Sequence, residues 1–345
     1  MPSHRDQLGD TTGPLVVRLL SQKGAPDAEA LTARMPGHSL DQGDVRFTIE
    51  DEPGVDVVVV INYLKYDTTI HARAGYIWNW HNEPIVRQPF AQGYDRIYTH
   101  VTQSDDSRVR NAPPLLDWWI DKTFDDLKSL EMPEKRALVS AIASTKTMIP
   151  GHQRRNDFIE ALTTRCPEVD VYGHGRARSL EDKWSGLAPY RYSIAIENTS
   201  SPHYWTEKIA DCFLSYTVPV YFGATNIGDY FPEDSFIWLP LDQPEVAVET
   251  IERLSKDDWS ARIPALKEAR RRMLENYSLV GQITNRVAGE REAILSSPQV
   301  STRVHGRRTR PGGWIRGLGL PGNIRARMDR RRQRQSRQFR GASAD

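Results

Sequence analysis

The chain has 345 residues, enough for two domains that each bury a hydrophobic core. Its hydrophobic content of 39% and mean hydropathy of −0.58 are typical of soluble proteins, and it has no run of about 18 apolar residues that could span a membrane. The net charge of +1 hides an asymmetry, because residues 303–345 hold thirteen arginines and two aspartates, a net +11, so the preceding 302 residues sum to −10. The acidic body and the cationic tail are therefore expected to have different partners.

The N-terminal half consists of short apolar runs separated by polar turns. Four of these runs have the continuous hydrophobic pattern of strands buried in a parallel sheet: 16–20, 55–64, 74–80 and 96–102. The segments between them are long enough for helices, for example at 27–35. Residues 111–135 are rich in aromatic residues and marked by prolines, and we interpret them as the connection between two domains.

A second alternation of strands and helices begins at residue 136. Strands are predicted at 136–144, 168–173, 193–198 and 218–223, and helices at 154–166, 206–215, 245–256 and 258–276. Alternation in two halves predicts an α/β fold with two Rossmann-like, doubly wound domains. Ligands of such sheets bind beyond the carboxyl ends of the strands, at helix N-termini. Cys212 lies on the apolar face of a predicted helix and is expected to be a small core residue.

The stretch from Tyr190 to Phe236 is the most distinctive part of the chain. A predicted strand ends at Asn198, a turn of hydroxyl-bearing residues follows, and Thr206 is a good N-cap for the next helix. The N–H groups and positive dipole end of that helix suit a diphosphate, with Lys208 as an added charge. Glu207 would accept hydrogen bonds from sugar or ribose hydroxyls, or else would only improve the helix dipole.

This stretch, YRYSIAIENTSSPHYWTEKIADCFLSYTVPVYFGATNIGDYFPEDSF, resembles the donor-binding signature of the family 10 glycosyltransferases, the α1,3/α1,4-fucosyltransferases of bacterial type. The resemblance extends over residues 75–240 and implies a GT-B architecture of two Rossmann-like domains. It further implies an inverting enzyme that moves L-fucose from GDP-fucose to a hydroxyl of an oligosaccharide or glycoconjugate. One departure is Phe222, where relatives often have tryptophan.

Five residues match donor-binding positions of the resembled family. Arg155 stands where relatives have an arginine followed by asparagine at a helix start, and Tyr204 matches the aromatic residue before the Thr-Glu-Lys triplet. Asn198, Glu207 and Lys208 complete the set. An arginine at a domain cleft can bind a diphosphate through two hydrogen bonds. The alternative for Arg155 and its neighbour is that both are merely solvated.

The resemblance implies a carboxylate base on the acceptor side, and Glu83 is the candidate. It follows an apolar strand and directly precedes proline, as in relatives, although the serine that relatives place between the two is missing. A general base takes the proton of the attacking hydroxyl. The alternative is a glutamate that only serves a turn. Nearby Trp78, Trp80 and His81 either stack on acceptor sugar rings or fill the core.

The expected domains are residues 1–133 for the acceptor together with the connection, 134–302 for the nucleotide sugar, and 303–345 as an arginine-rich tail. No cofactor or metal is expected, because the chain has no Asp-x-Asp pair and no zinc-ligand spacing. Two other functions stay open: a GT-B transferase for another nucleotide sugar, and a non-catalytic carbohydrate- or polyanion-binding relative.

Two interpretations of the arginine-rich tail are equally favoured. It is either a solvated, disordered segment or a contact with an anionic membrane surface, and nucleic-acid binding is the least favoured alternative. The first residues lack the apolar segment of a secretory signal. The expected location is therefore the cytoplasm, with peripheral attachment to the inner membrane face if the tail binds lipid.

Overall fold

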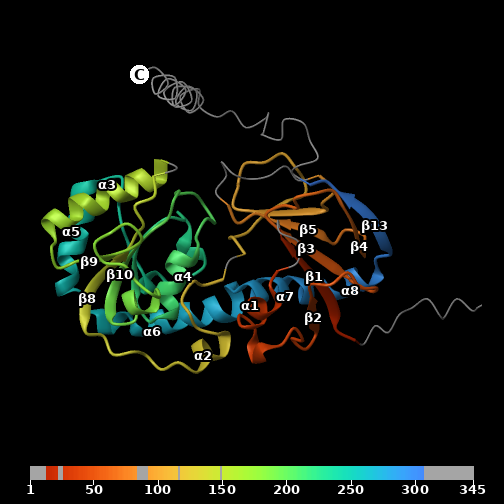
Figure 1. Cartoon of the computed structure of the whole chain (residues 1–345), viewed down its shortest axis with the longest axis horizontal. Coiled ribbons are helices and arrows are strands. Elements are labelled where there is room, and N and C mark those ends of the chain that lie inside the picture. The colour runs from red at the N-terminus through yellow and green to blue at the C-terminus, as the bar shows by residue number, and fades with distance from the viewer. Residues whose placement is uncertain (1–12, 22–25, 84–91, 116, 148–149, 307–345) are drawn as a thin grey trace, which may run out of the picture.

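The computed structural model describes residues 13–21, 26–83, 92–115, 117–147 and 150–306. These residues form two parallel sheets, each with its own helices, which lie side by side in Figure 1. The α/β class and the doubly wound arrangement predicted from the sequence are confirmed. A small third sheet pairs a strand near the end of the described chain with one from the N-terminal half.

The first sheet has the strand order β2-β1-β3-β5-β6-β7, and all its pairs are parallel. Its central strand β3 is a run of valines whose side chains are buried on both faces, which explains why the sequence shows a continuous apolar pattern there. The strands are β1 (Leu15–Ser21), β2 (Val45–Thr48), β3 (Val57–Ile61), β5 (Ile77–Trp80), β6 (Arg96–Thr99) and β7 (Val109–Asn111). A short helix, α1 (Ala28–Thr32), joins β1 to β2.

The second sheet has the order β12-β11-β10-β8-β9, again entirely parallel. Its strands are β8 (Ala137–Ile142), β9 (Asp170–Tyr172), β10 (Tyr190–Ile196), β11 (Val218–Phe222) and β12 (Ile237–Trp238). Its helices are α3 (Pro150–Arg165), α4 (Glu207–Leu214), α5 (Pro244–Glu252) and α6 (Trp259–Arg272). The predicted connection contains α2 (Phe124–Ser129), which begins with a capping box at Thr123.

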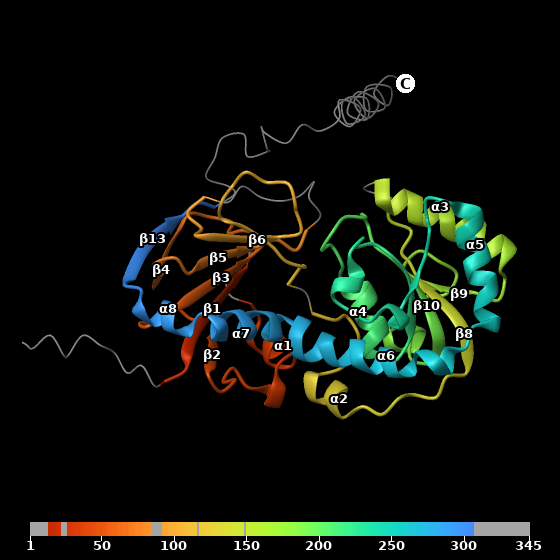
Figure 2. The same ribbon diagram turned by 180° about the vertical axis from the view of Figure 1, so that it is seen from behind.

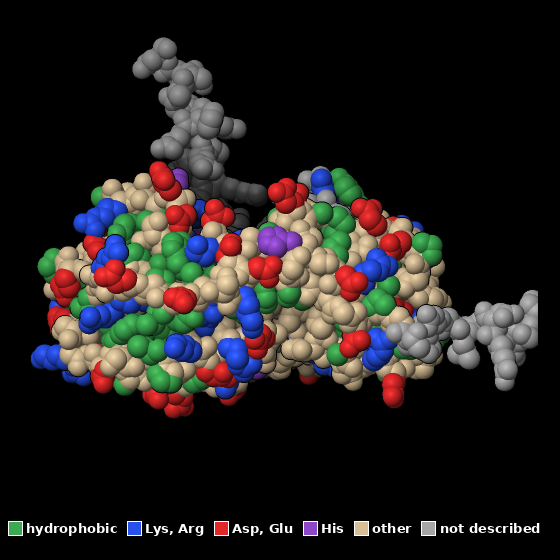
Figure 3. All heavy atoms as spheres, turned by 90° about the horizontal axis from the view of Figure 1, so that it is seen from below, with side chains coloured by type: hydrophobic (Ala, Val, Ile, Leu, Met, Phe, Trp, Pro, Cys, Tyr) green, Lys and Arg blue, Asp and Glu red, His purple; other side chains and the backbone are tan. Residues whose placement is uncertain are grey.

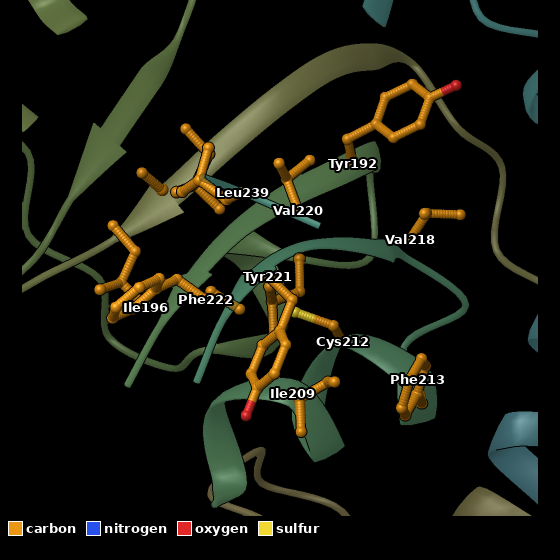
Figure 4. Close-up of a cluster of buried hydrophobic side chains, with 14 of the residues drawn as sticks. Tyr192, Ile196, Ile209, Cys212, Phe213, Val218, Val220, Tyr221, Phe222 and Leu239 are labelled. Atoms are coloured by element: carbon orange, nitrogen blue, oxygen red, sulfur yellow. The ribbon is translucent and has the colours of Figure 1, made fainter. Parts of the chain in front are cut away.

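Helix α4 packs its apolar face against β10 and β11. Figure 4 shows the side chain of Tyr221, from β11, pointing toward Ile209 and Cys212 of α4. Cys212 is 2% exposed, and burial raises the pKa of its thiol to about 12, so the prediction of an inert core residue is confirmed. This packing fixes the N-terminus of α4 beyond the carboxyl ends of the two strands.

After α6 the chain returns to the first domain. The expected boundaries, which assigned residues 134–302 to the second domain, are therefore not those of the structure. Helices α7 (Leu279–Gly289) and α8 (Arg291–Ser296) bury Ile283, Val287 and Ile294 in the core of the first sheet. The helical run through α6 and α7 extends from one sheet to the other in Figure 2. Strand β13 (Gln299–Val304) then pairs antiparallel with β4 (Thr68–Arg73). Residues 279–302 therefore belong to the first domain in space, because their apolar faces cover its sheet.

The carboxylate of Asp67 holds the chain just after β13. It lies 3.1 Å from a guanidinium nitrogen of Arg303 and 3.2 Å from Nδ1 of His305, and it accepts the backbone N–H of Gly306 at 2.9 Å. A Cβ at Gly306 would lie 2.1 Å from the backbone of Tyr66. The cationic segment thus begins after Gly306, and the expected tail boundary at residue 303 cuts through β13. Residues 307–345 lie outside the described part.

This arrangement predicts different effects for two truncations. A chain ending at residue 306 should keep the melting temperature of the full-length protein within about 2 °C, because β13 and its contacts with Asp67 remain. A chain ending at residue 298 loses the whole pairing with β4, and each lost hydrogen bond is worth about 1 kcal/mol. We expect its melting temperature to fall by at least about 5 °C. Equal melting temperatures for both truncated chains would show that β13 does not stabilise the fold.

No helix within the described residues is both long and apolar enough to cross a bilayer. On the face shown in Figure 3, acidic and basic side chains are interspersed. Helix α6 illustrates such mixing, since Arg271 and Arg272 both pair with Glu268. Neither sign of charge dominates that face.

Candidate functional site

The carboxyl ends of β3 and β5 fix the position of Glu83. Asn62, at the end of β3, accepts a hydrogen bond from the backbone N–H of Asn82 at 2.9 Å. The side-chain amide of Asn82 in turn binds both backbone groups of Leu115, with two bonds of 2.7 Å. Glu83 follows directly and is half-buried. The backbone around the candidate base is therefore held at the edge of the first sheet, beside the connection.

The aromatic candidates for the acceptor side lie in the core. Trp78 and Trp80 are 0% exposed, and Trp80 stacks on Tyr98 with ring centroids 4.3 Å apart while its Nε1 donates to a backbone carbonyl. Neither indole has a face free for a sugar, so the stacking role is wrong and the core alternative holds. The cause is that β5 is covered on both faces. His81 is also buried, with Nε2 2.6 Å from Oδ1 of Asn79.

In the second domain, Glu197 organises the start of α4. Its buried carboxylate accepts hydrogen bonds from the backbone N–H of Thr206 at 2.7 Å and from the Thr206 hydroxyl at 2.8 Å. The predicted N-cap at Thr206 is confirmed, since its Oγ1 accepts from the N–H of Lys208. The Lys208 ammonium lies 3.2 Å from Glu197 and 3.1 Å from Glu207.

Two carboxylates thus share one ammonium, and their pKa values move in opposite directions. Burial raises the pKa of Glu197 in spite of Lys208. Burial also acts to raise the pKa of Glu207, but Lys208 and Lys183 outweigh it, so this pKa lies below its usual value. Burial disfavours the charged form of Lys208, yet the two carboxylates together raise its pKa. The charge of Lys208, expected to face a diphosphate, is already balanced within the protein.

Unbalanced positive charge lies instead at the start of α3. Arg155 is 7% exposed and donates to Oδ1 of Asn198 at 3.3 Å and to the carbonyl of Ser144 at 3.1 Å. Burial lowers the pKa of Arg155 and so does the neighbouring Arg176, whereas Glu197 raises it. Arg176 itself donates to Asn156, also on α3, at 3.0 Å. The two guanidinium groups thus lie near each other on the same side of α3, and Arg155 contacts Asn198 just after β10.

The close approach of α3 to Asn198 depends on glycine. A Cβ at Gly151 would lie 1.8 Å from the backbone oxygen of Asn198. Arg154, the neighbour of Arg155, points elsewhere and pairs with Asp242 at 2.9 Å, with both side chains exposed. Of the two adjacent arginines, only Arg155 therefore belongs to the site.

The two domains meet at Tyr204 and along the connection. The Tyr204 ring, 2% exposed, lies 4.7 Å from the ring of His100, which follows β6. On the second turn of α4, Asp211 accepts the backbone N–H of Trp119 at 2.8 Å and pairs with Lys183 at 2.7 Å. The edge of the first sheet and the N-terminal half of α4 thus face each other across the junction.

Several residues of this junction were not among the sequence candidates. Glu197 carried a signal, because a charged residue at the end of an apolar strand is expected to have a partner. Asp211, four residues after Glu207, shares its helix face. Arg176 and His100 carried no local signal, since only the assembled fold brings them to Arg155 and Tyr204.

Two parallel α/β domains whose polar residues meet at the carboxyl ends of their strands define a GT-B glycosyltransferase fold. Residues 132–260 match the family model described as glycosyltransferase family 10 (fucosyltransferase), C-terminal. This match includes the stretch from Tyr190 to Phe236 and confirms its resemblance to that family.

Individual relatives agree with the family model. An α-(1,3)-fucosyltransferase FucT of Helicobacter pylori is 34% identical over 110 residues, which is 30% of this chain and 22% of the relative. A putative fucosyltransferase-like protein of Arabidopsis thaliana is 29% identical over 161 residues, 46% of this chain and 29% of the relative. The chain therefore matches well under half the length of these curated relatives. A crystal structure of α1,3-fucosyltransferase with GDP-fucose has the same fold, with a TM-score of 0.51 and 18% identity over 85% of this chain and 93% of that one.

Proposed function

We propose that this protein is an inverting α1,3/α1,4-fucosyltransferase that moves L-fucose from GDP-fucose to a hydroxyl of an oligosaccharide or glycoconjugate. The observation that carries the proposal is the ordered start of α4, where Glu197 and Thr206 fix Glu207 and Lys208 within the family 10 domain. This group faces the edge of the first sheet that holds Glu83. The solved relative with GDP-fucose supports GDP-fucose as the donor.

The reaction assigns each side of the junction a separate task. Glu83 accepts the proton of the acceptor hydroxyl while the oxygen of that hydroxyl forms a bond to the anomeric carbon of fucose. The bond from that carbon to the β-phosphate oxygen breaks on the opposite face, which inverts the configuration, and the electron pair leaves with GDP. Arg155 and Arg176 stabilise the charge that develops on the diphosphate. Glu207 accepts hydrogen bonds from sugar hydroxyls.

Thermal shift with nucleotides tests the proposal. A ligand that binds only the native state stabilises it by about 2.7 kcal/mol at a concentration of 100 Kd. GDP and GDP-fucose should raise the melting temperature, and incubation with GDP-fucose should release GDP and fucose at a rate that a suitable glycan increases. Stabilisation by UDP or CMP but not by GDP would favour a transferase for another nucleotide sugar. Binding of glycan without any nucleotide would favour a non-catalytic relative.

Arg155 should matter for GDP affinity and Arg154 should not. Hydrogen bonds to charged groups contribute about 1.5–3 kcal/mol. Arg155→Ala removes the guanidinium, and Arg155→Lys removes its planar arrangement of donors. Both variants should therefore weaken GDP binding about ten- to a hundredfold. Arg154→Ala is the matched control, because this exposed side chain pairs with Asp242. It should bind GDP within about twofold of wild type by calorimetry. Equal affinities for all the variants would place the diphosphate away from α3.

We further propose that transfer needs no divalent cation, because Arg155, which contacts Asn198, and the nearby Arg176 supply positive charge for the diphosphate. Turnover of GDP-fucose should therefore persist after exhaustive treatment with EDTA. A control incubation with added Mg²⁺ or Mn²⁺ should change the rate less than about threefold, the weak effect expected of nonspecific phosphate screening. A complete loss in EDTA that is reversed by metal would contradict the proposal.

The cationic segment suggests a location. Residues 307–345 contain twelve arginines and two aspartates, and basic residues near an anionic bilayer each contribute about 1 kcal/mol of attraction. We propose a cytoplasmic enzyme attached peripherally to the inner membrane face. Sedimentation with vesicles containing phosphatidylglycerol should capture the full chain and not the chain ending at residue 306. Equal capture would assign the segment no role in lipid binding, and capture by nucleic acid alone would favour that alternative.

A further inference from the structure

His100 is a buried polar side chain at the domain junction that the proposed reaction leaves without a role. It follows β6 at the carboxyl end of the strand, and it is 2% exposed. Both of its ring nitrogens, Nδ1 and Nε2, are buried and have no hydrogen-bond partner among the residues that the structure describes. Such groups are rare in native proteins and call for an explanation.

The environment of His100 keeps its imidazole neutral. Burial, followed by the charges of His81 and His203, lowers its pKa to about 4. A neutral imidazole carries one N–H donor and one acceptor nitrogen. Leaving both unpaired in the interior destabilises the free protein, so this histidine is not explained by stability.

The position of His100 indicates what it could bind. Its ring lies 4.7 Å from that of Tyr204, which stands two residues before the N-cap of α4. Glu207, proposed to bind sugar hydroxyls, is the first residue of that helix. A hydroxyl group both donates and accepts hydrogen bonds, so a sugar with several hydroxyls matches a neutral imidazole, whereas a phosphate offers acceptors only.

We propose that His100 binds a hydroxyl of the transferred sugar, reaching from the first domain to a donor held by the second. The inference rests on the proposed function and adds a sugar-positioning residue to it. Because Tyr204 covers the imidazole, the two rings must separate enough for the hydroxyl to reach a ring nitrogen. The contact would then orient the sugar relative to the domain that carries Glu83, and would discriminate GDP-sugar from GDP.

Two variants and two ligands test this proposal. His100→Phe keeps an aromatic ring against Tyr204 but removes both polar nitrogens, whereas His100→Gln keeps one donor and one acceptor. We expect His100→Phe to bind GDP within twofold of wild type and GDP-fucose about tenfold more weakly, with His100→Gln recovering to within about threefold. The melting temperature of ligand-free His100→Phe should rise, because two buried unpaired nitrogens are gone.

The outcomes separate this inference from the proposed function. If wild type binds neither GDP nor GDP-fucose, both ideas fail. If wild type binds GDP and GDP-fucose and His100→Phe binds both with the same affinities as wild type, only the proposed role of His100 fails. A lower melting temperature for His100→Phe with equal losses for the two ligands would make His100 a structural residue and overturn the proposal. If His100→Phe does not fold, His100→Leu replaces it, because leucine also lacks both ring nitrogens. GDP-fucose affinity in His100→Leu within twofold of wild type would overturn the proposal.

Discussion

Replacement of Lys208 by methionine should destabilise the protein by at least about 3 kcal/mol at neutral pH. The variant keeps the length and apolar stem of the side chain but removes the only cation within 3.2 Å of both Glu197 and Glu207 among the described residues. Removing one partner of a buried ion pair typically costs about 3–5 kcal/mol, because the remaining charge is left uncompensated. The lower limit is appropriate here, since the lysine side chain is 21% exposed.

The pH dependence of this loss identifies its cause. Without Lys208 the pKa values of both carboxyls rise, so the folded variant binds protons above the pKa of about 4.3 that glutamate has in the unfolded chain. A carboxyl with a raised pKa in the folded state favours folding at acid pH and loses this contribution as the pH rises. The stability gap between wild type and Lys208→Met should therefore narrow when urea denaturation is measured at pH 5 instead of pH 7.

A second substitution provides the matched control. Glu207→Gln combined with Lys208→Met leaves a single carboxylate, which Thr206 already stabilises through hydrogen bonds. The double variant should regain at least half of the lost stability and should depend less on pH. A loss that is the same at pH 5 and pH 7 would point to packing and not to charge. An unchanged midpoint in Lys208→Met would refute the proposed electrostatic role outright.

Strands and helices with strong local patterns were predictable from the sequence. Strands β8 and β11 begin and end within two residues of their expected bounds and β10 within three, and Thr206 caps α4 as expected. In each case the relevant interactions lie within one element or between neighbouring elements, so local composition is sufficient. The position of Glu83 at the edge of the first sheet follows from the same reasoning, since carboxyl ends of parallel strands meet at one edge.

Features that depend on contacts between distant segments were not predictable. The pairing of β13 with β4 joins residues such as Val300 and Ala72, far apart in the chain, and a single sequence gives no register for it. The local sequence around Trp78 and Trp80 is compatible with either a ligand site or a core. Only the coverage of β5 on both faces decides between these two positions. Arg176 lies in a loop after β9, and its approach to Arg155 results from the assembled domain.

Glu83→Gln should lower the rate of GDP release from GDP-fucose at least about a hundredfold, whether the acceptor is a glycan or water. A positioned general base contributes about 10²–10⁴-fold, and the amide is nearly isosteric but cannot take the proton. GDP affinity should stay within twofold, because the arginines and α4 belong to the second domain. The melting temperature should change little, since Asn82 and Leu115 hold the backbone here and glutamine keeps the size of the side chain.

Asn82→Ala is the informative comparison for that result. It leaves the carboxylate in place but removes two hydrogen bonds to the backbone of Leu115, so buried N–H and C=O groups lose their partners and the melting temperature should fall. A loss of activity with intact stability in Glu83→Gln, beside a loss of both in Asn82→Ala, would separate proton transfer from support of the site. If Glu83→Gln turns over GDP-fucose within a few-fold of wild type, the base is another residue. The absence of serine after this glutamate would then mark a real departure from the family pattern.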